Sequence, residues 1–276
     1  MQERVRGSQE QDAETAGLSE ARRGAAAILT LNRPHARNGL SLDLMLAIRE
    51  AVFRLSADRD VAAVVLAANG PAFCAGHDLK EMAAHRADAD GGLAFYETAM
   101  TTCADMMQAI LHSPQPFIAA VHGTATAAGC QLVATCDLAV AADDATFATP
   151  GVNIGLFCST PMVALTRNVP RKRAMEMLLL GELMPASEAA AYGLVNRVVP
   201  RARVLDEALA LADQIASKSP LTVAIGKEAF YRQVEMPTAE AYRYAADVMV
   251  RNMMARDAEE GIGAFIEKRK PEWKGC

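Results

Sequence analysis

The stretch that decides the fold runs from Pro116 to Asp137 and reads PFIAAVHGTATAAGCQLVATCD. Its first part, Phe117 to Val121, is an apolar run of strand length, and the glycine and threonines that follow break the strand period. Nearly every side chain from Thr124 to Gly129 is very small, and a helix is predicted to start there. The free N–H groups of a helix N-terminus suit an oxyanion. A helix of small residues that simply packs closely on a sheet remains the alternative.

A second loop of small residues follows another predicted strand. The apolar run Val61 to Ala67 leads directly into GPAFCAGHDLKE, residues 70–81. Two such loops can each direct one backbone N–H at the same carbonyl oxygen, which is the arrangement that stabilises an enolate or a tetrahedral oxyanion. The pair of loops therefore favours a site that polarises a carbonyl group.

Several motifs in order give the chain a family resemblance. It resembles the enoyl-CoA hydratase (crotonase) superfamily from about Ala25 to the C-terminus. The motifs that carry the resemblance are Leu31-Asn32-Arg33-Pro34, Phe73-Cys74-Ala75-Gly76-His77-Asp78-Leu79-Lys80-Glu81, Ala119-Ala120-Val121-His122-Gly123, Gly129-Cys130-Gln131-Leu132 and Cys136-Asp137-Leu138.

The resemblance implies an α/β fold, the crotonase spiral of ββα units with a C-terminal helical trimerisation segment. We expect a flexible tail over residues 1–23, the spiral core over 24–200 and the helical segment over 201–276. The tail is polar, contains several glutamates and has no apolar stretch, so it is neither a secretory signal nor a membrane span. Its acidity also fits a transit peptide poorly. A cytoplasmic protein is therefore predicted.

Bulk composition points to small-molecule chemistry. The 276 residues are 51% hydrophobic, which is enough for a full core, and carry a net charge of −5 with no dense run of Lys or Arg. A nucleic-acid partner and a membrane partner are not expected. The six cysteines show no C-x-x-C pair and no metal-ligand spacing, so reduced thiols and no metal are predicted.

The order of elements predicts strands alternating with helices. Strands are expected over 25–31, 61–67, 117–121, 138–142, 146–148 and 195–199. Ser41 is predicted to cap the first helix and Ser187 a short one, with further helices over 100–111 and 171–180. The D-x-D-G run within 83–92 faintly resembles a calcium loop, but a solvated, mobile loop is favoured because the later ligands are lacking. Beyond Pro200 the pattern is helical, with breaks at Pro220, Pro237 and around Gly261.

The resemblance also assigns the chemistry. It implies that the backbone N–H groups of His77 and Ala128 bind a thioester oxygen. The two catalytic glutamates of the family's hydratases fall on Gln131 and Gly151. An amide cannot take up a proton near neutral pH, and glycine has no side chain, so a very slow hydratase is expected. The imidazole of His77 is either a hydrogen-bonded loop group or an acid or base.

Other residues are weighed as substitutes for the missing carboxylates. Asp137 is expected to be structural, and His122 is expected to stay in its turn. Cys158 and Ser159 lie where a related dienoyl-CoA isomerase carries an aspartate, but no base is visible for either, so nucleophilic catalysis is disfavoured. Asn153 completes the set of candidates.

The coenzyme A end of the site follows from the resemblance as well. It implies that adenine lies against Ala75, Asp78 and Leu79, with Lys80 at the pocket edge. Phe265 and Lys268 would contact the nucleotide, although a solvated basic tail is the alternative for this segment. No cofactor is expected beyond the coenzyme A of the substrate. The resemblance also implies a homotrimer or a dimer of trimers.

Two functions follow from these residues. The favoured one is an acyl-CoA enzyme of the hydratase/isomerase family that works by oxyanion stabilisation with a weak or unassigned base. The second is a non-catalytic acyl-CoA binding or regulatory protein that kept the fold and lost the carboxylates. A serine peptidase on the same fold lacks a Ser-His-Asp set and is discounted.

Overall fold

The computed structural model describes residues 13–276. The tail predicted for residues 1–23 thus lies partly outside the described residues, and its last part is wrong. Residues 13–23 form two strands, β1 (Ala13–Thr15) and β2 (Leu18–Arg23), joined by a turn in which Gly17 has φ +81°. They form the edge of a sheet, where one face meets water, and this explains why a paired segment is so polar.

The main sheet runs in the order β1-β2-β3-β4-β6-β8-β11. From β3 onward neighbouring strands are parallel, while β1, β2 and β3 are antiparallel. The inner strands are buried on both faces, as continuous apolar runs predict. The bounds are β3 (Ala26–Leu31), β4 (Ala63–Ala68), β6 (Phe117–Val121), β8 (Leu138–Ala142) and β11 (Arg197–Val199).

A smaller second sheet holds the segments that matter for the site. Its order is β10-β9-β7-β5, with bounds Met184–Pro185, Thr146–Ala148, Thr124–Thr126 and Ala72–Cys74. The strands β5, β7 and β9 are parallel to one another. Strand β7 was not predicted, because its three small residues looked like the start of the following helix. The sheet thus sets the ends of β5, β7 and β9 side by side.

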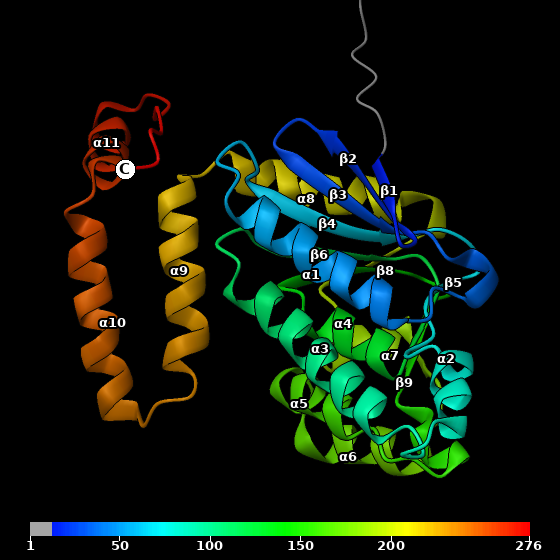
Figure 1. The fold of residues 1–276 in the computed structure, drawn as a ribbon. Helices are drawn as coiled ribbons and strands as arrows, with labels where there is room; N and C mark the ends of the chain where they lie inside the picture. The colour runs from blue at the N-terminus through cyan, green and yellow to red at the C-terminus, as the bar shows by residue number, and fades with distance from the viewer. Residues whose placement is uncertain (1–12) are drawn as a thin grey trace, which may run out of the picture.

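Helices cover the main sheet on both sides (Figure 1). Helix α8 (Val204–Ala216) packs on β4, β6 and β8, and α1 (Leu42–Ser56) packs on α3 (Leu93–His112) in front of the sheet. Ser41 caps α1 as predicted, its hydroxyl accepting a hydrogen bond from the Leu44 amide at 3.3 Å. The remaining helices of the body are α2 (Leu79–Ala84), α4 (Ala128–Thr135), α5 (Ser159–Asn168), α6 (Arg171–Leu180) and α7 (Ala186–Ala191), with short 3-10 turns η1 (Pro34–Ala36), η2 (His85–Ala87), η3 (Pro150–Ile154) and η4 (Arg201–Arg203).

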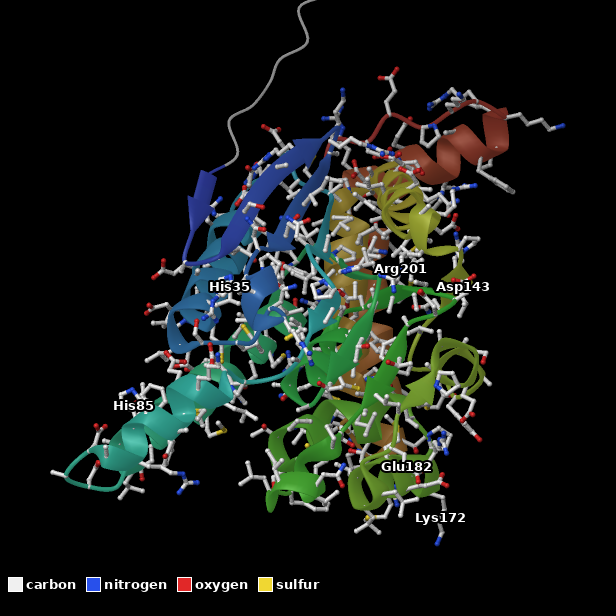
Figure 2. All side chains as sticks on the ribbon, turned by 90° about the vertical axis from the view of Figure 1, so that its right-hand side faces the viewer. His35, His85, Asp143, Lys172, Glu182 and Arg201 are labelled. Atoms are coloured by element: carbon white, nitrogen blue, oxygen red, sulfur yellow. The ribbon has the colours of Figure 1, made fainter. Side chains whose placement is uncertain are left out.

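The segment predicted as a loop over residues 83–92 is partly helical. It holds the end of α2, the turn η2 and the start of α3, and His85 lies where this corner projects from the body (Figure 2). Asp90 explains the early start of α3, because its carboxylate accepts hydrogen bonds from the amides of Gly92 and Ala94, both at 2.9 Å. Asp90 therefore satisfies one free amide in the first turn of α3 from outside the helix, whose N-cap residue is Gly92.

The C-terminal helices form an arm. Helices α9 (Pro220–Gln233), α10 (Thr238–Met253) and α11 (Arg256–Glu267) stand beside the body rather than on it (Figure 1). The break expected around Gly261 is wrong, since α11 continues through that residue and the interruption falls at residues 254–255. The predicted Ser187 cap is also wrong, because α7 already begins at Ala186 and shows no side-chain cap. Large apolar side chains are exposed along the arm, among them Tyr242, Met254, Phe265 and Ile266.

Candidate functional site

The two loops that the sequence singled out pack directly on each other. Gly76 has φ +94°, and a Cβ added there would lie 2.9 Å from Ala127 Cβ and 3.4 Å from Ala128 N. A Cβ added to Gly129 would lie only 2.2 Å from the carbonyl oxygen of Cys74. Both positions therefore require glycine, because the first turn of α4 rests on the backbone that follows β5.

A short bridge orients the amide of His77. Leu40 N donates to Gly76 O at 2.8 Å, and Asp78 N donates to Leu40 O at 3.0 Å. In such a parallel bridge the groups of the residue between them point to the other side. Within residues 13–276, neither His77 N nor Ala128 N donates a hydrogen bond. Two unpaired backbone donors thus occur where the loops meet.

The imidazole of His77 is mostly enclosed, and neither of its ring nitrogens has a hydrogen-bond partner in the described part of the chain. Burial lowers its pKa below the ordinary value, and the nearby Leu40 backbone opposes this only in part. The ring is therefore neutral at pH 7. A neutral imidazole without a partner differs from the hydrogen-bonded loop histidine weighed from the sequence, and it retains the capacity to accept a proton.

Gln131 lies one turn into α4 and is almost fully buried. Its backbone N–H donates to Ala127 O at 3.0 Å, but its side-chain Oε1 has no partner among the described residues. Helical side chains lean toward the helix N-terminus, so this carboxamide lies toward Ala128. A carboxamide can donate and accept hydrogen bonds, but it is no base.

Gly151 is closed to any side chain. A Cβ built on it would lie 2.8 Å from Leu156 O and 2.9 Å from Cys158 Sγ. The same thiol accepts a hydrogen bond from Gly151 N at 3.3 Å, and burial raises its pKa. Cys158 therefore occupies the space that a longer residue at position 151 would enter, and it is not activated as a nucleophile.

Asp78 stabilises the local structure. Its Oδ1 accepts hydrogen bonds from the amides of Lys80 (3.1 Å) and Glu81 (3.3 Å) at the start of α2, and its Oδ2 pairs with Arg33 Nη2 at 2.9 Å. Burial opposes the charge, but these donors outweigh it and lower the carboxyl pKa. Ala75, Leu79 and Lys80 are exposed beside it, so this rim is open to a ligand.

Phe265 and Lys268 do not join this rim within one chain. Both belong to the end of α11, which stands on the arm at the opposite side from α2 and β5 (Figure 1). Phe265 is exposed, and Lys268 adopts a left-handed conformation, φ +57°, that ends the helix. The structure thus separates two groups that the sequence placed at one nucleotide.

The other candidate residues have structural partners or lie apart. Asp137 is structural, as predicted, since it binds Lys227, Tyr231 and the amide of Phe117. His122 stays in its turn, with Nε2 2.8 Å from Gly70 O. The hydroxyl of Ser159 donates to Phe157 O at 3.3 Å, and Asn153 lies against Gly181. None of these side chains takes the place of the carboxylate that is lacking at position 131.

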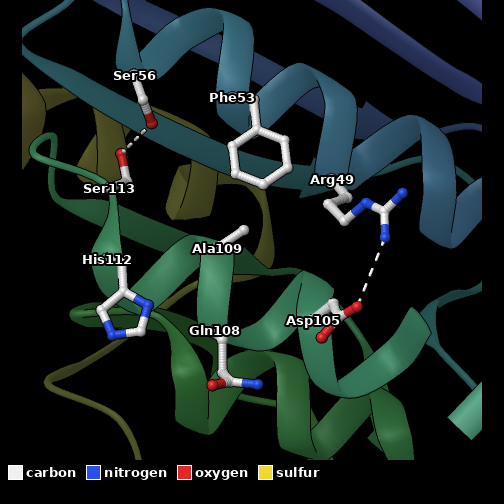
Figure 3. Close-up of a pocket in the computed structure, with 8 residues that line it drawn as sticks. All are labelled: Arg49, Phe53, Ser56, Asp105, Gln108, Ala109, His112 and Ser113. Carbon is white, nitrogen blue, oxygen red and sulfur yellow. Dashed lines mark hydrogen bonds and ion pairs between the residues drawn. The ribbon is translucent and has the colours of Figure 1, made fainter. Parts of the chain in front are cut away.

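A groove in the described residues lies away from the two loops. It has a volume of about 360 Å³ and runs between α1 and α3, where Arg49 faces Asp105 at 3.7 Å and Phe53 stands above Ala109 (Figure 3). No residue of the two loops lines it. Across residues 13–276 there is also no cluster of three metal-ligating side chains, and none of the helices is long and apolar enough to cross a bilayer.

Thr149 is a buried polar residue that the sequence analysis did not single out. It follows β9 directly, is 1% exposed, and its hydroxyl has no partner among residues 13–276. The sequence signal was a small polar residue between a strand and a proline, which alone is too common to be specific.

Comparison with known proteins decides the family. The model of the enoyl-CoA hydratase/isomerase family matches residues 21–276. This chain belongs to the enoyl-CoA hydratase/isomerase family. A crystal structure of an enoyl-CoA hydratase from Mycobacterium smegmatis superimposes with a TM-score of 0.89 at 52% identity, over 93% of this chain and 98% of that one. The predicted crotonase fold is therefore confirmed.

The resemblance also reaches one branch of the enoyl-CoA hydratase/isomerase family. The pieces Ala75–Asp78, Ala125–Gln131 and Phe147–Asn153 look most like enoyl-CoA hydratase domain-containing protein 3. The mitochondrial protein of that name from rat is 46% identical over 245 residues, 89% of this chain and 80% of its own. The crystal structure of human enoyl-CoA hydratase domain-containing protein 3 gives a TM-score of 0.88 at 43% identity, over 93% of this chain and 100% of that one. This narrower prediction is confirmed.

The predicted cytoplasmic location is wrong. It rested on the acidity of residues 1–23, but the relatives from rat, mouse, human, frog and zebrafish are all named as mitochondrial proteins. Composition of a short segment is a weak guide to location, because targeting signals are read by receptors rather than by bulk charge.

Proposed function

We propose that this protein is an acyl-CoA enzyme of the hydratase/isomerase type, in which the backbone N–H groups of His77 and Ala128 bind the thioester oxygen. Such binding polarises the carbonyl, acidifies the α-carbon and makes the β-carbon of an enoyl group electrophilic. The observation that supports this is the contact of Gly76 with Ala127 and Ala128, beside two amides without a partner in residues 13–276.

Hydration is expected to be slow or altered. Each general acid or base contributes about 10²–10⁴-fold to such a reaction, and positions 131 and 151 supply neither. The neutral imidazole of His77 belongs to the same residue as one of the two proposed oxyanion donors. We assign the remaining general acid–base catalysis to this imidazole.

The coenzyme A moiety is proposed to lie over the open rim at Ala75, Asp78, Leu79 and Lys80. Phe265 and Lys268 then reach a nucleotide only from the arm of another copy of the chain. The exposed apolar side chains of the arm support such an assembly, proposed as a homotrimer or a dimer of trimers, because large apolar patches on a surface mark interfaces. No cofactor besides the substrate's own coenzyme A enters this proposal.

A panel of acyl-CoA thioesters tests the function. The purified protein is mixed with crotonyl-CoA, butyryl-CoA and free coenzyme A, and both thermal stabilisation and product formation are measured. Stabilisation by thioesters together with slow turnover is expected. A protein that no thioester stabilises would contradict the proposal, because any ligand that binds the native state raises its stability.

Turnover by the native protein separates the enzyme from its alternative, an acyl-CoA binding protein without catalysis, and one substitution tests the role of position 131. Gln131→Glu places a carboxylate at the buried end of the site and is expected to raise crotonyl-CoA hydration by about 10²-fold or more. Gln108→Glu, on the exposed face of α3, is the matched control and is expected to change nothing. Stabilisation by thioesters with no turnover in the native protein favours the alternative.

A further inference from the structure

The last residues of the chain fold back onto the base of the arm. Residues 272–276 follow α11 and turn back beside it (Figure 1). The indole Nε1 of Trp273 donates to Ser217 O at 2.8 Å, directly after α8. A Cβ added to Gly275 would lie 3.4 Å from Pro220 Cγ, in the first turn of α9. The C-terminal tail therefore contacts the junction between α8 and α9, where the arm leaves the body.

One buried carboxylate joins three segments at this junction. Asp257 lies in the first turn of α11 and is 1% exposed. Its Oδ2 accepts the hydroxyl of Ser219, the N-cap residue of α9, at 2.6 Å. The carboxylate also accepts the amides of Lys274 (2.8 Å) and Gly275 (3.0 Å), and the Asp257 amide donates to Cys276 O at 3.0 Å. Hydrogen bonds to a charged group are stronger than neutral ones. The start of α9, the start of α11 and the tail are thus held at one point.

The indole ring of Trp273 lies on α11 at a glycine. A Cβ added to Gly261 would lie 3.0 and 3.1 Å from two carbons of the ring, whereas one added to Gly263 would meet nothing within 4 Å. Beside the ring, Glu260 Oε1 accepts the amide of Glu272 at 2.8 Å. Glycine weakens the interior of a helix, but at position 261 it lets the ring lie close to the backbone. The tail therefore runs along one side of α11.

Helix α11 depends on such contacts for its order. It has 12 residues, and an isolated helix of this length is marginal in water. Its first turn holds Asp257, and its last turn holds Phe265, with Lys268 ending the helix. Because a helix is stiff over this length, contacts that fix its first turns also fix the direction of its last turn.

Resting on the proposed function of Phe265 and Lys268, we infer that residues 272–276 form a strap. The strap holds α11 against the α8–α9 junction and thereby positions Phe265 and Lys268 for the nucleotide of a thioester. These two residues touch the ligand in this arrangement, and the strap acts through them.

Hydrogen exchange of the ligand-free, full-length protein tests the strap. Trp273→Ala removes the ring from Gly261 and the hydrogen bond to Ser217 O. It is expected to speed amide exchange in α11 and at residues 274–275 about tenfold, with β4 and β6 unchanged. Lys274→Ala is the matched control, because Lys274 joins the strap through its backbone amide, and it is expected to exchange like the native protein.

A second pair of variants leaves the strap's own sequence intact. Gly261→Leu puts a side chain where the ring of Trp273 lies, so it is expected to speed exchange of the amides at 274–275 about tenfold. Gly263→Leu makes the same change in helix propensity but enters open space. It is expected to leave these two amides as protected as in the native protein.

Ligand binding tests the positioning. Calorimetry measures the Kd for butyryl-CoA, which Trp273→Ala is expected to raise about tenfold. In a Phe265→Ala/Lys268→Ala background, Trp273→Ala is expected to raise the Kd no further, because the two residues through which the strap acts are already gone. A strap that only stabilised the fold would weaken binding equally in both backgrounds.

The outcomes are distinct. Unchanged exchange in both Trp273→Ala and Gly261→Leu overturns the inference, and so does faster exchange that extends to β4 and β6. Faster exchange confined to α11 and the strap, with an unchanged Kd for butyryl-CoA, overturns the positioning of Phe265 and Lys268. If the native protein binds no thioester, the proposed function fails by itself, and exchange in the ligand-free variants still decides whether the strap holds α11.

Discussion

Lys227 on α9 places its Nζ 2.7 Å from Asp137 Oδ2, at a buried point where the C-terminal arm begins. The same ammonium donates to the carbonyl oxygens of Ile110 and Gln115, and the other carboxylate oxygen accepts the hydroxyl of Tyr231 at 3.0 Å. Every polar atom of the pair thus has a partner. The pair ties the arm to the end of the central helix, so it sets where the arm stands.

Asp137→Ala is expected to destabilise the protein by about 3–5 kcal/mol, because it leaves the buried ammonium of Lys227 without its counter-charge. Denaturant unfolding measures this free energy. Glu235→Ala breaks the exposed pair with Arg167 and is the control, with an expected cost of about 0–1 kcal/mol. Equal costs for the two variants would show that the buried pair does not anchor the arm.

Gly129→Ala is expected to be severely destabilising, because the new methyl group would lie 2.2 Å from Cys74 O. This oxygen belongs to the backbone and cannot rotate away as a flexible side chain could. Gly263→Ala, also within a helix, meets nothing within 4 Å and is expected to stabilise by about 0.5–1 kcal/mol. Melting temperatures of the two variants compare the sites. A Gly129→Ala protein as stable as the native one would mean that the two loops do not touch.

The hydrogen bonds of Asp257 predict that the packing of the C-terminal tail is sensitive to acid. It is buried, and burial opposes its charge, but hydrogen bonds from Ser219 and from the amides of Lys274 and Gly275 lower its carboxyl pKa below the ordinary 3.8. A depressed pKa in the folded state adds stability that is present above pH 3.8 and is lost as the pH falls through the folded value. The C-terminal tail is thus expected to loosen at low pH.

Asp257→Asn checks this linkage. The variant is expected to be less stable than the native protein at pH 7, and the difference is expected to shrink below pH 4 as both side chains become neutral. Asp247→Asn, exposed on α10, is the control and is expected to follow the native curve. A difference that stays constant down to pH 2 would contradict the assignment.

The strands and helices that the sequence predicted correctly are those whose ends are marked by a local pattern. The strands 117–121, 138–142 and 146–148 and the helix 171–180 were predicted to the residue, because apolar runs and a glycine stop mark their ends. The strands over 13–23 were not, since an edge hairpin has no continuous apolar run. Helix α5 and strand β7 also carry too little periodicity to be separated from loops.

The candidate site, too, was predicted only where a local sequence pattern marks it. The motifs around Gly76 and Gly129 correctly predicted two loops that meet, because glycine there answers a local close approach. The long-range facts could not be read: that Cys158 fills the space before Gly151, that Thr149 Oγ1 lacks a partner in the described residues, and that Phe265 stands on the far arm. Each depends on which distant segments the fold brings together.

Thiol labelling tests the burial of the cysteines. Cys276 is exposed, whereas the other five are buried, and burial raises the pKa of Cys74, Cys103 and Cys130 to about 12. Only Cys276 is expected to react rapidly with an alkylating reagent at pH 7.5, because the thiolate is the reactive form. Cys276→Ser is expected to abolish fast labelling. Fast labelling that persists in this variant would place another thiol at the surface.

Gly151 limits how the missing carboxylates can be restored. A side chain at 151 must displace Leu156 O, which is backbone, and Cys158 Sγ. Gly151→Ala is therefore expected to destabilise by about 1–3 kcal/mol, and Cys158→Ala is expected to recover only the part due to the thiol. The double variant Gln131→Glu/Gly151→Glu is accordingly expected to hydrate crotonyl-CoA no faster than Gln131→Glu alone. A much faster double variant would show that the segment from Leu156 to Cys158 moves aside at little cost.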